Sequence, residues 1–322
     1  MPSYRTGTVT AILTEREGLQ RVEVDGQPAY VLTQLIGPVA LGDRVVMNTT
    51  AVELGLGTGG SHVVHWNLER ESWAEPGPGH EMKLRYTSLQ VDAGIASAPP
   101  EGGVGQPVVA CFLHSQMAYV AAAFKRAAPD RTLAYVMTDG GALALAVSDV
   151  AADLRGHGLL DVTVTAGQAF GGDREAVNVH HALEMAADHD AVVVAMGPGS
   201  LGTGTAYGFS GLEVAGVLDA AEAMLCRPVV ALRYSEADSR GRHQGVSHHA
   251  RTALEVSTAQ VAVPIPAGEP SPDLGEHEIV EVDVPDVRDW PYTSMGRTPA
   301  DDPKFFEYAA AAGVYAAQCL VD

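Results

Sequence analysis

Several side chains that could do chemistry lie together in the stretch 233–249. Its three histidines, His243, His248 and His249, fall within seven residues of one another. Neutral imidazole can act as an acid or base, hydrogen-bond a substrate or ligate a metal. Ser247 can cap a helix that starts after it, and the positive end of that helix keeps nearby imidazoles neutral. Three interpretations stay open for this cluster: a divalent metal site, acid–base or hydrogen-bonding chemistry, and a solvated loop.

A metal site needs side chains that converge on one point. His248 and His249 are adjacent in the predicted helix, where successive side chains point about 100° apart. If a metal binds, we therefore expect His243 and one of this pair to hold it. His114 or Asp139 from neighbouring loops would complete the site.

The arginines of the same stretch suit a different ligand. Arg233 and Arg242 can bind phosphate or carboxylate through planar, paired hydrogen bonds. Asp238 lies between them in the sequence. We predict that these three residues contact a small anionic or nucleotide-like molecule.

A glycine-rich loop, GPGSLGTGT, occupies 197–205 and follows the apolar segment 191–196. Glycines let backbone N–H groups approach an anion closely. The loop is interpreted either as a phosphate or carboxylate site or as a purely structural loop. As an anion site it would use Gly197, Gly199, Ser200, Gly202, Thr203 and Gly204.

The same loop contains the spacing GxGxxG, yet NAD(P) is not the cofactor that we expect. In a dinucleotide-binding fold the helix starts at once after this motif. Here Ser210 and Glu213 have the spacing of a capping box, which places the helix start at Ser210. The next strand ends at Arg233 instead of an acidic residue.

From Pro107 onward, apolar strand-like segments alternate with helical ones. Strands that are apolar throughout and joined by helices are typical of a parallel sheet covered on both faces. We therefore predict a doubly wound, mostly parallel, Rossmann-like α/β domain. The expected strands are 108–113, 133–137, 162–165, 191–196, 229–232 and 261–265, with an edge strand over 278–284. The expected helices are 117–128, 142–155, 174–188, 211–225, 247–257 and 303–320.

In such sheets, ligands bind beyond the carboxyl ends of the strands. The first expected strand ends at His114 and Ser115, and the second at Asp139. The fourth and fifth strands lead into the glycine-rich loop and the histidine cluster. Because sequential strands are usually neighbours, we expect these two loops to share one site. Asp139 and His243 are the candidates for acid–base catalysis there.

The first 80 residues contain several short strand-like segments, with a tight-turn signal at Asp25-Gly26. We predict a small SH3-like or OB-like β-barrel over 1–80, a linker with a strand over 81–106, and the α/β domain with an acidic C-terminal extension over 107–322. The strand in the linker is expected over 83–91. So small a barrel needs cover for its apolar side chains, either from the α/β domain or from another subunit, and we expect a homodimer.

Composition excludes several classes of protein. The 322 residues include 40 Asp and Glu against 20 Lys and Arg, a net charge of −20. Such a surface repels phosphate backbones, so we expect no nucleic-acid partner. Three widely spaced cysteines argue against a disulfide framework. Neither a signal peptide nor a run of about 18 apolar residues is present, so we expect a cytoplasmic protein without a membrane partner.

Several segments together resemble a known family. The glycine-rich loop 197–205, the segment AGQAFGGD over 166–173 and the segment RHQGVSHH over 242–249 carry the resemblance, with NTTAVELGLGTGG over 48–60 and MKLRYT over 82–87. They are similar to the bacterial family catalogued as domain of unknown function 3866. The resemblance implies a bacterial cytoplasmic protein and assigns no activity or catalytic residue.

Two classes of function remain open from the residues. One is an enzyme that acts on a small anionic molecule at the strand ends. The other is a non-catalytic ligand sensor or protein-interaction module that uses the barrel and the acidic tail. The sequence does not identify the reaction or the substrate.

Overall fold

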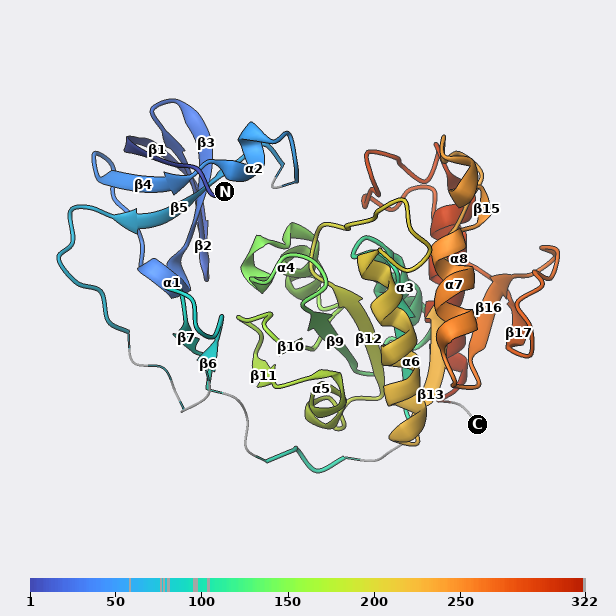
Figure 1. The fold of residues 1–322 in the computed structure, drawn as a ribbon. Coiled ribbons are helices and arrows are strands. Elements are labelled where there is room, and N and C mark those ends of the chain that lie inside the picture. The colour runs from blue at the N-terminus through green and yellow to red at the C-terminus, as the bar shows by residue number, and fades with distance from the viewer. Residues whose placement is uncertain are drawn as a thin grey trace. The chain divides into compact units, whose positions relative to one another are not determined.

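The computed structural model describes residues 1–57, 59–75, 77, 79, 82–94, 98–102 and 105–320. The chain divides into two compact units, Met1–Gly94 and Ile95–Asp322 (Figure 1). Of the predicted linker 81–106, residues 81, 95–97 and 103–104 lie outside the described part.

The first unit is a closed five-stranded barrel with the strand order β1-β2-β3-β5-β4. Its strands are β1 (Tyr4–Arg16), β2 (Leu19–Val24), β3 (Gln27–Leu32), β4 (Arg44–Asn48) and β5 (His62–Asn67). Strands β3 and β5 pair in parallel and the other pairs are antiparallel. Of the two predicted barrel types, the OB-like barrel is the one that this Greek-key strand order fits. Two one-turn helices, α1 (Thr33–Ile36) and α2 (Thr50–Glu53), lie between strands.

The tight turn between β2 and β3 forms where the sequence predicts it. Asp25 and Gly26 have φ angles of 50° and 75°, as a type I′ hairpin turn requires. The single strand expected over 83–91 is wrong. The described part of that stretch forms a hairpin of two short strands, β6 (Met82–Lys83) and β7 (Val91–Asp92).

The second unit is built on an eight-stranded parallel sheet, as the α/β prediction requires. Its order is β11-β10-β9-β12-β8-β13-β16-β17. The strands are β8 (Pro107–Cys111), β9 (Leu133–Thr138), β10 (Val162–Ala166), β11 (Arg174–Ala176), β12 (Ala191–Met196), β13 (Arg227–Ala231), β16 (Ala262–Pro266) and β17 (Glu278–Val282). A separate short hairpin joins β14 (Tyr234–Ser235) to β15 (Gly245–Val246).

Helices cover both faces of this sheet. Helices α3 (Gln116–Ala127), α4 (Asp149–Gly156) and α8 (Pro303–Gln318) share one buried cluster. Helices α5 (Val179–Met185), α6 (Glu213–Ala223) and α7 (His248–Val256) pack mainly in the cluster on the opposite face (Figure 1). Three 3₁₀ turns, η1 (Leu145–Val147), η2 (Ser210–Leu212) and η3 (Gly241–His243), complete the elements. Among the described residues, no helix is long and apolar enough to cross a bilayer.

Three local predictions need correction. Residues 174–176 form the edge strand β11 instead of a helix start, because they pair with β10. The helix expected from 142 begins only at α4, where the Ser148 hydroxyl accepts the N–H of Ala151. The capping box at Ser210 does not form. Its hydroxyl accepts the N–H of Leu201, and the Glu213 carboxylate instead accepts the hydroxyl of Thr138.

The order of the strands in the sheet determines which loops lie close together. The chain forms β8 at the centre, builds outward through β9, β10 and β11, returns to insert β12 beside β8, and then places β13 on the other side. Strands β12 and β13 are therefore not neighbours, contrary to the expectation for sequential strands. Their carboxyl ends flank that of β8, where the direction of winding reverses. Reversal points of this kind are where open α/β sheets hold ligands.

Candidate functional site

A pocket of about 530 Å³ lies beyond the carboxyl ends of β12, β8 and β13. Loops that follow all three strands line it, together with residues from α4 and from the C-terminal segment. The lining residues are Leu113, His114, Ser115, Val150, Pro198, Gly199, Ser200, Gly202, Arg233, Arg240, Arg242, His243, His249 and Met295. The glycine-rich loop and the histidine cluster thus meet in one pocket, although β8 separates their strands.

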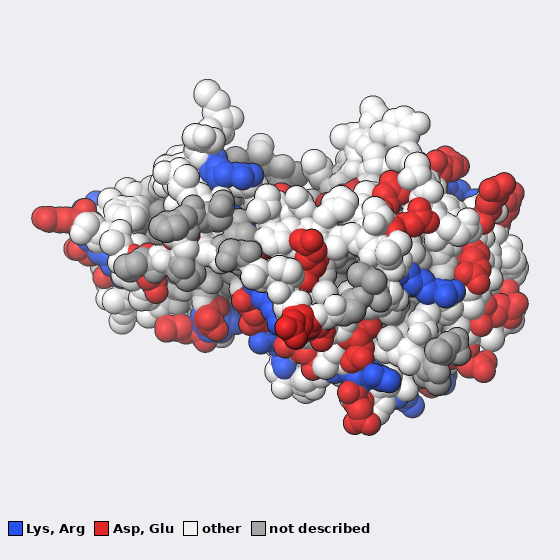
Figure 2. Space-filling model, turned by 90° about the horizontal axis from the view of Figure 1, so that it is seen from below, with Lys and Arg blue, Asp and Glu red and all other residues white. Residues whose placement is uncertain are grey.

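The lining of this pocket is basic. Its described residues include three arginines and no carboxylate, in a chain with 40 acidic residues and 20 basic ones. Figure 2 shows acidic side chains spread over one face of the molecule, with fewer basic side chains between them. The pocket therefore reverses the prevailing charge of the chain, which favours an anionic ligand.

Arg233 is the most unusual of these arginines because it is buried, with 4% of its surface exposed. Its Nη1 donates to Nδ1 of His249 at 3.1 Å. Within the described residues it forms no ion pair with a carboxylate. Burial and the nearby Arg240 lower its pKa to about 10. The guanidinium remains charged at neutral pH. The charge of Asp238 acts on it at longer range, but no described carboxylate lies within ion-pair distance of this buried, positively charged group.

Arg240 is neutralised in a way that Arg233 is not. Its Nε and Nη2 donate to the two carboxylate oxygens of Asp238 at 2.9 and 2.8 Å. This pairing holds the pKa of Asp238 well below its usual range. Asp238 does not line the pocket. Arg242 is exposed and, in the part of the chain that is described, forms no ion pair.

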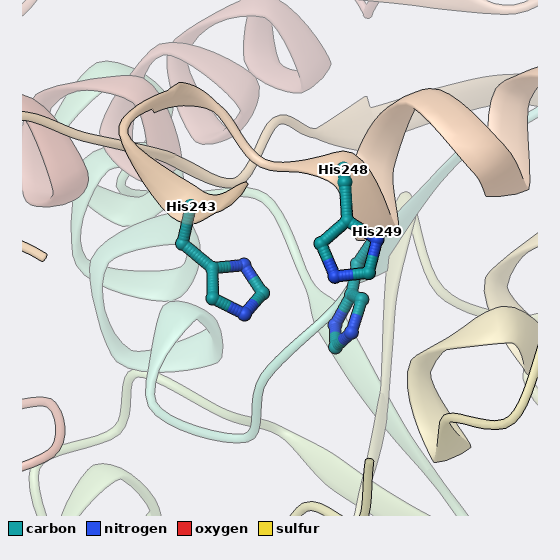
Figure 3. Close-up of side chains that lie close together, drawn as sticks. All are labelled: His243, His248 and His249. Carbon is teal, nitrogen blue, oxygen red and sulfur yellow. The ribbon is translucent and has the colours of Figure 1, made fainter. Parts of the chain in front are cut away.

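Three histidines converge beside these arginines (Figure 3). His243 comes from η3, and His248 and His249 occupy the first turn of α7. One ring nitrogen from each lies within 4.8 Å of the others. The ring nitrogens of His248 and His249 thus lie closer together than the divergence of adjacent helical residues suggests. The 100° divergence applies to the Cβ atoms, whereas long side chains in a first turn bend back toward the helix start.

Ser247 organises this cluster as the predicted helix cap. Its hydroxyl accepts the N–H of His249 at 3.2 Å and lies 2.7 Å from Nδ1 of His243. The His249 ring stacks on Phe209, with 3.8 Å between centroids and 2° between planes. Burial and the charge of Arg233 lower the pKa of His243 to about 4 and that of His249 to about 3. Both rings are therefore neutral at physiological pH.

The glycine-rich loop contributes backbone to the pocket. Gly199, Ser200 and Gly202 line it, and within the described chain their N–H groups have no hydrogen-bond acceptor. By contrast, the N–H of Leu201 is bound by Ser210, and that of Thr203 by the carbonyl of Gly208. Gly199 has a φ angle of 101°, which other residues rarely adopt.

Gly197, the first glycine of the motif, serves packing. A Cβ there would lie 2.0 Å from the carbonyl oxygen of Ala142. Gly197 therefore allows close contact between two loops and does not line the pocket. Thr203 and Gly204 also lie outside the lining, in the part of the loop that folds back toward Gly208.

The residues that follow β8 form one wall of the pocket. His114 is held on both sides, with Nδ1 3.0 Å from the carbonyl oxygen of Met196 and Nε2 2.6 Å from the Ser148 hydroxyl. Burial lowers its pKa to about 4, and its ring nitrogens are already used within the fold. The Ser115 hydroxyl lies 2.7 Å from that of Ser294.

Asp139 is separate from the pocket lining. Its Oδ2 accepts the N–H of Gln168 at 2.8 Å, beyond the end of β9. The structure therefore does not bring together Asp139 and His243, the two predicted acid–base residues, around this pocket. The sheet order explains this, because β12 lies between β9 and β8.

Five lining residues were not among the predicted site residues: Leu113, Val150, Pro198, Arg240 and Met295. Arg240 could have been found, since it lies between two arginines that were singled out. Met295 belongs to the segment before α8, far from the rest of the site in sequence, and no local signal marks it. The Arg297 side chain and the buried Asp302 carboxylate, 2.8 Å apart, connect this segment to the start of α8.

Comparison with known proteins agrees with the resemblance seen in the sequence. A family model described as "Protein of unknown function (DUF3866)" matches residues 28–313. No curated protein sequence matches the chain significantly.

Proposed function

The chain belongs to the DUF3866 family, and for this member we propose that the second unit binds a small molecule through a phosphate or carboxylate group. The anion lies in the pocket beyond β12, β8 and β13, against Arg233 and Arg242. The observation that carries this proposal is the buried Arg233 guanidinium, which faces the pocket without a carboxylate partner among the described residues.

A buried charge without a partner is costly, and proteins usually pair it. This chain does so nearby, where Asp238 neutralises Arg240. At Arg233, an anionic ligand can supply the missing charge. The unpaired N–H groups of Gly199, Ser200 and Gly202 offer further donors to the same group. Backbone amides and guanidinium groups are a common combination for binding phosphate and carboxylate.

The proposal is tested by titrating the protein with inorganic phosphate, pyrophosphate and citrate under calorimetry, with thermal unfolding as a second readout. A ligand that binds the folded state raises the unfolding temperature by mass action. Arg233→Met removes the charge and keeps most of the side-chain volume. We expect it to weaken binding about tenfold or more, as loss of a charge-assisted hydrogen bond does.

Arg242→Met provides a second test if Arg233→Met folds poorly, because Arg242 is exposed. The matched control is Arg288→Met, which removes an arginine that pairs with Asp286 at the surface. Binding that is equal in all three variants would overturn the proposal, as would the absence of binding by every anion tested.

A further inference from the structure

We propose that His243, His248 and His249 hold a divalent transition-metal ion of the zinc class at the edge of this pocket. The inference does not depend on the anion site, since its evidence is the unsatisfied imidazole nitrogens and their convergence.

Two of these rings have a buried nitrogen with no partner. In the described part of the chain, three buried side-chain nitrogen or oxygen atoms lack a hydrogen-bond partner, and two of them are Nε2 of His243 and Nε2 of His248. Leaving such an atom unsatisfied costs free energy, so each instance in a folded protein calls for an explanation. A metal ion bound to both nitrogens would give each of these buried atoms the partner that it lacks.

The protein already orients His243 as a ligand. Its Nδ1 lies 2.7 Å from the Ser247 hydroxyl. When Nδ1 donates its proton to that oxygen, Nε2 presents a lone pair. Ligating histidines are typically held in this way by a hydrogen bond on the other ring nitrogen. His248 is partly exposed and can adjust its ring.

The distances suit a site that closes on the ion. One nitrogen from each histidine lies within 4.8 Å of the others, while tetrahedral zinc with Zn–N bonds of about 2.0–2.1 Å places its ligands about 3.3 Å apart. The rings must therefore approach by on the order of 1 Å. His249 holds the third position, and it binds the ion only after its Nδ1 gives up the hydrogen bond from Arg233. The neutral ring then ligates through Nδ1, or through Nε2 once the ring proton has moved to Nδ1.

The donor set defines the class of ion. Three imidazoles without a carboxylate suit zinc and its neighbours, whereas calcium and magnesium prefer oxygen ligands. His243 and His249 also line the pocket, so the remaining coordination position of the ion faces that space. Zinc sites with three protein ligands keep such a position for water or a substrate.

The nearby arginines determine in which direction a substitution should change zinc affinity. Burial is the main cause that lowers the pKa of His248, and the charges of Arg242 and Arg233 add to it. The same charges also oppose a bound cation. In buffer without a coordinating anion, Arg242→Met should therefore bind zinc more tightly than the unaltered protein. The same variant should bind phosphate more weakly. Zinc binding and phosphate binding therefore change in opposite directions, and the experiment can refute one proposal without refuting the other.

The experiment uses full-length protein freed of metal with a chelator. Zinc is titrated against a coloured competing chelator, and the bound metal is counted by mass spectrometry. We expect one zinc per chain. Loss of a residue that only hydrogen-bonds a ligand typically weakens metal affinity about 10–100-fold. His243→Ala and His248→Ala each remove a ligand itself, so each should weaken zinc binding by at least that factor. The control is His180→Ala, which removes an exposed histidine of α5.

Thermal unfolding without zinc identifies any variant that fails to fold. His248→Ala keeps the test usable if His243→Ala is unstable, because His248 is only partly buried. Absence of stoichiometric zinc binding overturns the proposal. Zinc binding that His243→Ala and His248→Ala leave unchanged overturns it too, since the ion would then be held elsewhere.

Discussion

At the scale of single residues, Glu213 shows how a side chain can acquire an unusual environment without a sequence motif. It begins α6, yet its carboxylate accepts the Thr138 hydroxyl at 2.5 Å at the end of β9. Burial, with the charge of Asp139, raises its pKa to about 7. An ordinary helix-starting glutamate is thereby converted into a group that titrates near physiological pH.

This shift predicts a pH-dependent stability. The pKa of Glu213 in the folded protein lies above the ordinary glutamate pKa of 4.5. Between these two pH values the folded state therefore binds more protons than the unfolded state. The contribution of Glu213 to the free energy of unfolding therefore decreases as pH rises from about 4.5 to 7. Above pH 7 the carboxyl is ionised in both states, and the full destabilisation is present. Glu213→Gln should stabilise the protein by at most about 3 kcal/mol at pH 8.

The measurement is urea unfolding of the Glu213→Gln variant at pH 5 and pH 8. The gain should be much larger at pH 8, because at pH 5 the native carboxyl is already mostly protonated. Glu255→Gln, at an exposed position of α7, serves as the control. Equal effects at the two pH values would show that the carboxyl of Glu213 ionises normally in the folded protein.

At the scale of elements, α3 and α8 pack closely because of one glycine. Gly313 lies within α8, and a Cβ at this position would be 2.2 Å from the carbonyl oxygen of Val120 on α3. The glycine lets the two backbones approach within van der Waals contact, which a larger residue would prevent. Helix α8 in turn lies against β16, β13 and β8, and the last two of these strands end at the site.

Gly313→Ala is therefore expected to destabilise the protein by about 1–3 kcal/mol, the usual cost of overpacking a core. The matched control is Gly216→Ala within α6, where a Cβ meets no atom within 4 Å. There alanine should stabilise by about 0.5–1 kcal/mol, because glycine is unfavourable in a helix interior. Urea unfolding of both variants measures the two effects, and the same sign at both positions would contradict the close helix contact.

At the scale of the whole molecule, the charge and the apolar surface lead to different expectations. The net charge of −20 favours solubility. The first unit nevertheless exposes large apolar side chains on its barrel and loops, which often mark an interaction surface when they are contiguous. They include Tyr4, Ile12, Leu13, Leu41, Leu54 and Leu56.

A homodimer remains our prediction for the assembly, since a second subunit would cover these side chains. Light scattering at micromolar concentration should then give twice the chain mass of 33.6 kDa. Replacing Ile12 and Leu13 with serine should favour the monomer if these residues lie in the interface. A single-chain mass for the unaltered protein would rule the dimer out.

The sequence alone determined most of the strands and helices of the second unit and the residue types of its loops. Apolar runs such as 191–196 predict buried strands because only a sheet covered on both faces can bury them fully. Ser247 predicts a helix cap, because its hydroxyl can accept an N–H that the helix leaves unpaired, and the structure confirms it. These features depend on local patterns of a few residues. Local patterns did not suffice at Ser210, where the capping box failed because both side chains bind outside it.

Only the tertiary structure decided which loops meet. The strand order places β8 between β12 and β13, and so brings 197–202 and 233–249 together while leaving Asp139 aside. It also brings Met295 into the pocket and leaves Arg233 buried without a carboxylate. Such proximity depends on the path of the whole chain through the sheet. A single sequence records the residue types along that path but does not record which distant residues it brings into contact.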